Sequence, residues 1–312
     1  IPFARAAGMV PVLMSQGRAS VTMMASEHWT GHAAAGHIHP GCLTVLADTA
    51  CGVAVGAAMN PIEPYATLDL RMDYLRPAKA GSALRCDAHC HRLSRSVAFV
   101  RGEVFQEGSD EAVAAVNATF MLSTSAGTPR PKPDAGGAGA VAAAAISAAA
   151  TSPTNQSRDP AAWQPPAASE PVLAHGPSPY VDYLGIRVAP GSPAPLFRMP
   201  YQHKLIGNPD LPALHGGVIA GFAETAAMLH LAQALQGAKL PKGIDFAVDY
   251  LRSGRPVETF AQCELVRVGG RVAQVQVRCW QSGPDNPIVV ARGHFLLTVP
   301  DAVVPDAAAP GA

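Results

Sequence analysis

The sequence predicts an α+β protein made of two similar units, each with one long apolar helix and a group of antiparallel strands. Three observations predict this class. A run of small and apolar residues from His39 to Met59 has the length of a helix, and Asp48 is its one charged side chain after His39. Segments in which apolar and polar residues alternate follow this run, as in strands with one buried face. The same order of segments recurs in the second half of the chain.

The two halves match without a gap when 176 is added to the residue number. This offset carries Asp48 to Glu224, and the register holds as far as Arg95 and Arg271. Other equivalent pairs are His39 and His215, Gly41 and Gly217, Thr49 and Thr225, Tyr74 and Tyr250, and Arg76 and Arg252. Self-similarity at a fixed offset indicates that the chain is a duplication.

The strands are predicted from their alternation. In residues 66–75 every second residue from Leu68 to Tyr74 is apolar and is expected on the buried face. Turn residues separate the segments, and residues 30–38 and 205–214 are expected to be loops that lead into helices at 39–59 and 215–236. The other strands are expected at residues 18–24, 82–93, 96–106 and 112–123, and at 196–204, 242–251, 259–268, 272–281 and 288–299.

The predicted organisation is a first unit over residues 1–123, a linker over 124–170, a second unit over 171–300 and a tail over 301–312. The linker consists mainly of Ala, Gly, Pro and Ser. Such a segment cannot bury enough apolar surface to offset its ordering entropy. We therefore interpret it as a tether between the units.

The composition favours a small-molecule ligand. Lys plus Arg equals Asp plus Glu at 23 each, and aromatic residues make up 6% of the chain. Neither nucleic acid nor a membrane is therefore expected as a partner. Both apolar runs approach the length that spans a bilayer, but an acid near the middle of each favours a buried helix.

The cysteines predict reduced thiols and a cytoplasmic protein, because the six of them show no CxxC spacing and no secretory leader is recognisable. A metal site is not expected. Cys86 and Cys90 fall on one face of a predicted strand and His89 and His91 on the other, whereas a closed zinc site needs four converging ligands.

Asp48 is the first candidate functional residue. A carboxylate in an apolar helix costs free energy unless it has partners. It is therefore either a structural hydrogen-bonding group or a group used in chemistry. We interpret His39 and His215, at the starts of the two helices, as residues that fix the preceding loop by hydrogen bonding.

A nearly uncharged helix that begins HGG at His215, an acid nine positions after that His, and a strand ending Tyr250-Leu251-Arg252 resemble the hotdog superfamily. The resemblance is greatest to acyl-CoA thioesterases of the phenylacetyl-CoA and 4-hydroxybenzoyl-CoA type, and covers about residues 6–122 and 180–298. It implies a curved antiparallel sheet wrapped around a central helix, with the two units fused in tandem as a pseudo-dimer. It further implies hydrolysis of an acyl-CoA to free acid and CoA without a cofactor, and association of pseudo-dimers into a homo-oligomer.

The resemblance also implies roles for individual residues. In that family the amide of the first Gly after the motif His polarises the thioester carbonyl, and an acid from the partner unit's helix is nucleophile or general base. An upstream Asn and a Ser or Thr on the strand after the helix assist. Carried over to this chain, the complete site consists of Asp48, Thr67, Asn208 and Gly216, supported by His215 and Gly217.

The opposite pairing of the two units is expected to be degenerate. Glu224 replaces the Asp, and Gly243 stands where the hydroxyl is needed. On the other side of this pairing, His32 replaces the Asn, and Pro40 follows His39 in place of the first Gly. Proline has no N–H to donate.

Candidates for binding the CoA phosphates are Arg76, Arg95, Arg252 and Arg271, which lie near the ends of predicted strands. Charged protection of a sheet edge explains them equally well.

Two other function classes fit the same residues. A hotdog hydratase or dehydratase would use a His and an acid, for which His39 and Glu224 are available. A non-catalytic acyl-CoA-binding module would need neither. The HGG start and the upstream Asn208 favour hydrolysis over the first class. The intact set of Asp48, Thr67, Asn208 and Gly216 argues against the second.

Overall fold

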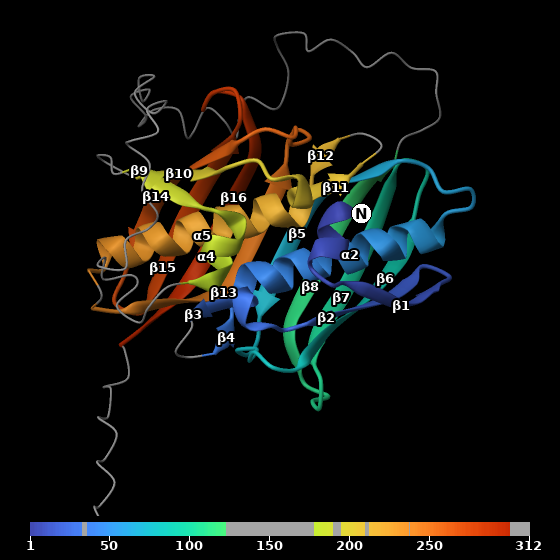
Figure 1. Ribbon diagram of the computed structural model, residues 1–312, viewed down its shortest axis with the longest axis horizontal. Helices are drawn as coiled ribbons and strands as arrows, with labels where there is room; N and C mark the ends of the chain where they lie inside the picture. The colour runs from blue at the N-terminus through green and yellow to red at the C-terminus, as the bar shows by residue number, and fades with distance from the viewer. Residues whose placement is uncertain (33–35, 123–177, 190–194, 210–211, 237, 300–312) are drawn as a thin grey trace, which may run out of the picture.

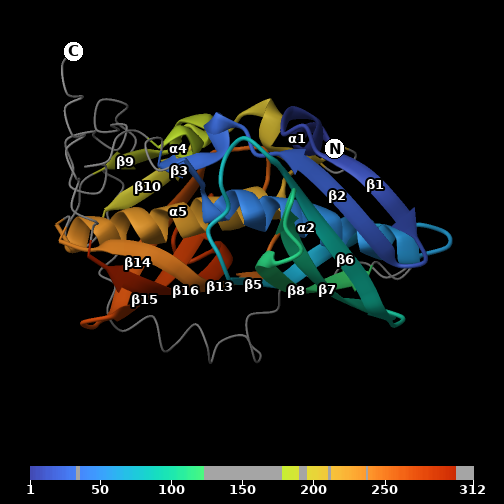
Figure 2. The ribbon, with the colours of Figure 1, turned by 90° about the horizontal axis from the view of Figure 1, so that it is seen from below.

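The computed structural model describes residues 1–32, 36–122, 178–189, 195–209, 212–236 and 238–299. Twelve strands form one antiparallel sheet, and two long helices, α2 (Pro40–Ala58) and α5 (Gly216–Ala234), lie against one of its faces (Figure 1). Seen from below, the sheet curves around both helices (Figure 2). The predicted fold class is therefore confirmed.

The first unit follows the predicted order. Its elements are α1 (Pro2–Ala6), β1 (Val10–Ser15), β2 (Arg18–Met24), β5 (Tyr65–Tyr74), β6 (Ala83–Leu93), β7 (Val97–Gln106) and β8 (Ala112–Leu122). The strands β2 and β5 to β8 lie within one residue of their predicted positions. The sequence does not predict β1, because all six of its residues are exposed and no buried face marks it.

The second unit repeats this arrangement with α4 (Pro179–Leu184), β9 (Arg187–Ala189), β10 (Leu196–Met199), β13 (Leu240–Tyr250), β14 (Thr259–Val268), β15 (Val272–Trp280) and β16 (Pro287–Thr298). The strand expected over 196–204 ends at Met199, since Pro200 has no N–H for a ladder. Residues 203–205 form a short 3-10 helix, η5 (His203–Leu205), and its equivalent in the first unit is η1 (Glu27–Trp29).

The segments expected to be loops before each long helix contain small hairpins. In the first unit β3 (Thr30–His32) pairs with β4 (His37–Ile38), and in the second β11 (Ile206–Asn208) pairs with β12 (Ala213–Leu214). Each hairpin ends one residue before the His that caps the helix. The hairpins therefore fix the direction in which α2 and α5 begin.

The two units share one sheet because β5 pairs with β13. The strand order is β1-β2-β6-β7-β8-β5-β13-β16-β15-β14-β10-β9. In the central pair Arg71 lies opposite Ala247, and these two residues are equivalent at the offset of 176. On one side of them Asp69 lies opposite Asp249. A pseudo-twofold axis therefore passes through the Arg71–Ala247 pair, as the tandem arrangement requires.

The helices α2 and α5 cross near their N-termini at glycines. A Cβ atom on Gly217 would lie 2.8 Å from Cα of Val45, and one on Gly41 would lie 3.0 Å from Cα of Gly221. These contacts are equivalent under the offset of 176. Side chains at the glycine positions would separate the two backbones. The crossing places the first turns of each helix beside the acid of the other.

A β-bulge changes the side-chain direction in β5. Thr67 pairs with Phe120 and Asp69 with Thr119, so Leu68 is an extra residue between them. Residues directly opposite each other share a face of the sheet, and Phe120 is buried. Thr67 therefore faces the helices, whereas strict alternation predicts Leu68 there. The equivalent bulge in β13 lies between Gly243 and Asp245.

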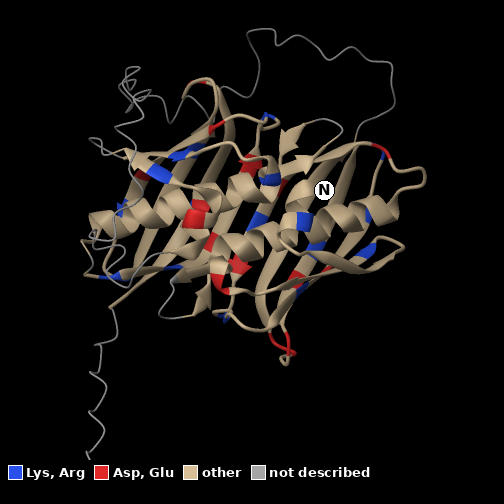
Figure 3. Ribbon diagram, in the orientation of Figure 1, with Lys and Arg blue, Asp and Glu red and all other residues tan. Residues whose placement is uncertain are grey.

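Charged residues are concentrated on the strands and turns, and the two long helices are nearly free of them (Figure 3). Among the described helices α2 alone is long and apolar enough to cross a membrane, and 72% of that stretch is buried inside the protein. The linker predicted at 124–170 and the tail predicted at 301–312 lie outside the described residues. The predicted boundaries of the units stay predictions.

Substituting Gly217→Ala should destabilise the protein, because the new methyl group must displace the backbone of α2 at Val45. Overpacking of this kind costs roughly 1–3 kcal/mol. Urea unfolding followed by circular dichroism measures the change. Gly52→Ala is the matched control, since its Cβ would lie 3.7 Å from the nearest atom, in ordinary contact, and should stabilise by up to about 1 kcal/mol. Equal stability of the two variants would contradict this account.

Candidate active site

Each long helix begins with a histidine that caps it. Nδ1 of His39 accepts a hydrogen bond from the amide of Gly41 at 3.0 Å, and Nδ1 of His215 accepts one from the amide of Gly217 at 3.1 Å. The other unit covers each ring, because Tyr180 of α4 stacks on His39 with centroids 4.6 Å apart and Phe3 of α1 lies 5.3 Å from His215. Each histidine side chain therefore caps its own helix and packs against the other unit.

Both histidines are uncharged at neutral pH. Burial lowers the pKa of His39 to about 3, and burial also lowers the pKa of His215, where the nearby Asp48 opposes the shift. Nδ1 of His215 accepts from an amide, so the proton of the neutral ring is on Nε2, which donates to Oγ1 of Thr49 at 3.1 Å. The 3.3 Å approach of His215 to Asp48 is therefore not an ion pair.

Asp48 crosses the junction between the units to the first turn of α5. Its Oδ2 accepts a hydrogen bond from the amide of Gly217 at 2.7 Å, and its Oδ1 accepts one from Oγ1 of Thr67 at 3.0 Å. A Cβ on Gly216 would lie 3.1 Å from Oδ2. The structure thus brings together Asp48, Thr67, His215, Gly216 and Gly217. The amide that binds the acid is that of Gly217, one residue after the predicted oxyanion donor.

Asp48 lies beside the N-terminus of α5. The first N–H groups of a helix have no partner within the helix, and the N-terminus carries the positive end of the helix dipole. Asp48 is only 6% exposed, but Thr67 and Gly216 beside it are partly exposed. Asn208 is exposed at the end of β11, on the hairpin that leads to His215.

Glu224 has a different environment. Its Oε2 accepts hydrogen bonds from Tyr74 at 2.8 Å and from Thr44 at 3.4 Å, both of the first unit, while Oε1 is buried without a partner among the described residues. Burial raises the pKa of Glu224 to about 8, although the hydrogen bonds from Tyr74 and Thr44 partly oppose this. Glu224 is therefore mostly protonated at neutral pH.

The residues around Glu224 differ from those around Asp48 in the ways that the sequence predicts. Pro40 begins α2 and has no amide proton, and the amide of Gly41 is bound to His39. Gly243 leaves no hydroxyl, and a Cβ there would lie 3.7 Å from Oε1 of Glu224 and 3.0 Å from the ring of Tyr74. His32 lies in β3.

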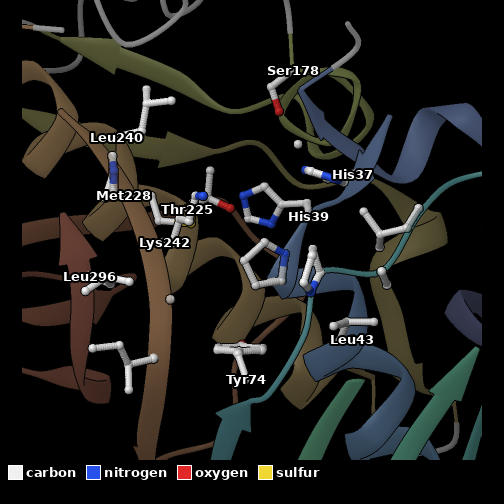
Figure 4. Close-up of a pocket in the computed structure, with 18 of the residues that line it drawn as sticks. His37, His39, Leu43, Tyr74, Ser178, Thr225, Met228, Leu240, Lys242 and Leu296 are labelled. Atoms are coloured by element: carbon white, nitrogen blue, oxygen red, sulfur yellow. The ribbon is translucent and has the colours of Figure 1, made fainter. Parts of the chain in front are cut away.

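Two cavities lie near the long helices. One of about 340 Å³ is lined by first-unit residues, among them Thr49 and Val53, and Asp48, Thr67 and Gly216 are not part of its lining. One of about 540 Å³ is lined by Thr225 and Leu229, the equivalents of Thr49 and Val53, on the Glu224 side. Its walls come from both units, with Leu43 and Tyr74 from the first and Met228, Leu240 and Leu296 from the second (Figure 4). The larger cavity therefore belongs to the pairing that lacks the predicted catalytic groups.

The candidate arginines divide into two groups. Arg76 lines the larger cavity and pairs with Glu111 at 3.0 Å, and the equivalent Arg252 donates to the carbonyl oxygen of Pro287 at 2.6 Å. Arg95 and Arg271 are exposed in the turns between β6 and β7 and between β14 and β15. The predicted binding of CoA by these residues stays a prediction.

Reasoning from the sequence missed Tyr74 and Thr44 as partners of Glu224. Tyr74 was expected to be a core residue on the apolar face of β5. The Tyr74 ring can lie where its hydroxyl reaches Glu224 only because residue 243 is Gly, since a larger side chain there would collide with the ring. The one indication in the sequence was that position 243, the equivalent of Thr67, is Gly and has no hydroxyl.

Comparison with known proteins identifies the family. A model of the thioesterase superfamily matches residues 35–113 and 211–288, which together make up just over half of the chain. The chain therefore belongs to the thioesterase superfamily and contains its domain twice. A candidate esterase of Pseudomonas aeruginosa is 29% identical over 87 residues, and the match spans 28% of this chain and 63% of that protein.

Solved structures show the same fold over nearly the whole chain. A candidate thioesterase from Novosphingobium aromaticivorans has a TM-score of 0.63 at 16% identity, with 92% of this chain and 98% of that chain covered. A conserved hotdog protein of unknown function from Alicyclobacillus acidocaldarius has a TM-score of 0.61 at 14% identity, with 96% and 99% covered. The two units are therefore hotdog units fused in one chain.

The raised pKa of Glu224 predicts a pH-dependent contribution to stability. Between the ordinary value of 4.5 and about 8, the folded state holds a proton that the unfolded state has lost. The contribution is therefore full below pH 4.5 and is lost as the pH rises to about 8, by on the order of a few kcal/mol.

Urea unfolding of the wild type and of Glu224→Gln across this pH range measures the effect. The difference between them isolates Glu224, because the contributions of the buried histidines cancel. We expect the stability of the wild type to fall relative to the variant as the pH rises. A difference that is constant with pH would contradict the assignment.

Proposed function

We propose that the protein is an acyl-CoA thioesterase that hydrolyses its substrate at the Asp48 side of the helix crossing. One observation carries the proposal. The carboxylate of Asp48, from one unit, is held by Thr67 and lies at the first turn of the other unit's helix, bound to the amide of Gly217. This places an acid next to a group of backbone donors, as hydrolysis of a thioester requires.

The residues of this site have distinct tasks in the reaction. Hydrolysis develops negative charge on the thioester oxygen, which the amide of Gly216 at the helix N-terminus would stabilise. Asp48 either takes a proton from the attacking water or attacks the carbonyl carbon itself, and in both cases CoA leaves as the thiol and the free acid remains. Thr67 holds the carboxylate in position, and Asn208 is proposed to orient the water or the substrate.

Asp48→Asn and Glu224→Gln form a matched pair of acid-to-amide substitutions at equivalent positions. Asp48→Asn should lower turnover by roughly 10²–10⁴-fold, as expected for loss of a general base or nucleophile, whereas Glu224→Gln should keep most of it. Release of CoA from short, medium, long and aromatic acyl-CoAs, read with a thiol reagent, measures turnover. The reverse result would move the active site to Glu224, and silence of the wild type with every substrate would favour a binding protein.

Thr67→Val should slow turnover at unchanged fold, because it removes the hydroxyl donor to Asp48 and keeps the shape of the side chain. A hydrogen bond to a charged group contributes about 1.5–3 kcal/mol, which corresponds to roughly 10–100-fold in rate. Steady-state release of CoA measures it. Thr119→Val, on the neighbouring strand β8 opposite Asp69, is the control and should have no effect. Equal rates for the two variants would contradict the proposed role of Thr67 in catalysis.

A further inference from the structure

The larger of the two cavities lies at the pairing of the units that lacks the predicted catalytic groups. It measures about 540 Å³. A space of this size is in the range of small-molecule binding sites. Pro40 and Gly243 line this cavity and supply neither an amide N–H nor a hydroxyl, so any role of the cavity would be one other than hydrolysis.

The walls of this cavity are suited to an apolar group. Side chains from both units line it, and they include Leu43, Val181, Met228, Leu229, Leu240 and Leu296. Transfer of an acyl chain or an aromatic ring from water to such walls is favourable in proportion to the apolar area buried.

Two polar features of the same cavity indicate a ligand with a polar, negatively charged end. The hydroxyl of Ser178 is buried without a partner among the described residues and points into the cavity (Figure 4). A buried hydroxyl without a hydrogen bond is costly, so a ligand oxygen there would be stabilised. Lys242 also lines the cavity, is exposed, and has no ion-pair partner among the described residues.

The groups around Glu224 do not support hydrolysis. Pro40 offers no amide to a developing oxyanion, and the carboxyl group of Glu224 is bound by Tyr74 and Thr44. A carboxyl group that retains its proton at neutral pH is also a poor base. A ligand in this cavity would therefore remain intact.

We propose that this cavity is a second ligand site, which binds an apolar acyl group carrying an anionic head and does not hydrolyse it. The apolar part lies among Met228, Leu240 and Leu296, an oxygen of the ligand bonds to Ser178, and the negative charge lies near Lys242. An acyl-CoA and the free carboxylate released by hydrolysis share this chemistry. The proposal rests on the proposed function only for this choice of ligand class.

Isothermal titration calorimetry of the full chain carrying Asp48→Asn tests the proposal, with decanoyl-CoA, decanoate and CoA alone as probes. Met228→Trp in this background fills the cavity and should remove one equivalent of bound acyl ligand. Lys242→Glu should weaken binding at that site at least tenfold. Lys239→Glu makes the same charge change three residues away, outside the cavity lining, and should leave binding unchanged. Unfolding midpoints establish that each variant is folded.

Binding of decanoate would identify the head as a carboxylate, and binding of decanoyl-CoA alone would identify it as the phosphates of CoA. Both results support the site. Equal stoichiometry and affinity in the Met228→Trp and Lys242→Glu variants, or binding of CoA alone as tight as that of decanoyl-CoA, would overturn it. Free thiol is read in the same samples. Its release by the Asp48→Asn chain at the rate of the wild type would refute the proposed catalytic residue, separately from the binding result.

Discussion

The close crossing of α2 and α5 is the constraint on which both candidate sites depend. The backbones meet where Gly217 faces Val45 and Gly41 faces Gly221, so each helix presents its first turn to the acid of the other. A helix N-terminus supplies unpaired N–H groups and a positive partial charge. The same contact therefore provides the packing between the units and the polarity of the sites. The shared sheet, joined at β5 and β13, keeps the crossing in register.

Given this common frame, hydrogen-bond donors decide how each acid behaves. Asp48 accepts one hydrogen bond from the amide of Gly217 and one from the hydroxyl of Thr67, so each of its buried oxygens has a donor. Glu224 accepts both of its hydrogen bonds on one oxygen, and neither comes from a helix amide. Burial therefore has the larger effect on its pKa, which rises to about 8, and the carboxyl group keeps its proton at neutral pH. Two acids at equivalent positions thereby have different hydrogen-bonding environments.

Much of this fold was predictable because the duplication shows each helix and strand pattern in both halves of the chain. The helix and strand patterns occur twice in register, and the structure places both long helices and most strands where the patterns predict. The inward turn of Thr67 was not predictable from alternation, since the bulge at Leu68 reverses the faces locally; the residue was chosen only through the family resemblance. The hydrogen bond from Tyr74 to Glu224 was also missed, because it depends on space that Gly243 leaves across the junction. The larger cavity could not be read from the sequence for the same reason: its walls combine residues from both units.

Fusion of the units in one chain explains how the two sites could diverge. In a homodimer a change from Thr to Gly would alter both sites at once, because the same residue occurs in each subunit. In this chain positions 67 and 243 change independently, as do positions 40 and 216. Loss of the donor at Pro40 and of the hydroxyl at Gly243 therefore leaves Asp48 with Thr67 and Gly217 intact. Burial favours the neutral form of Glu224, and the hydrogen bond from Tyr74 only partly opposes this effect. A neutral acid at position 224 is also compatible with the apolar walls of the larger cavity, which Tyr74, Thr225 and Gly243 line on the same side of the crossing.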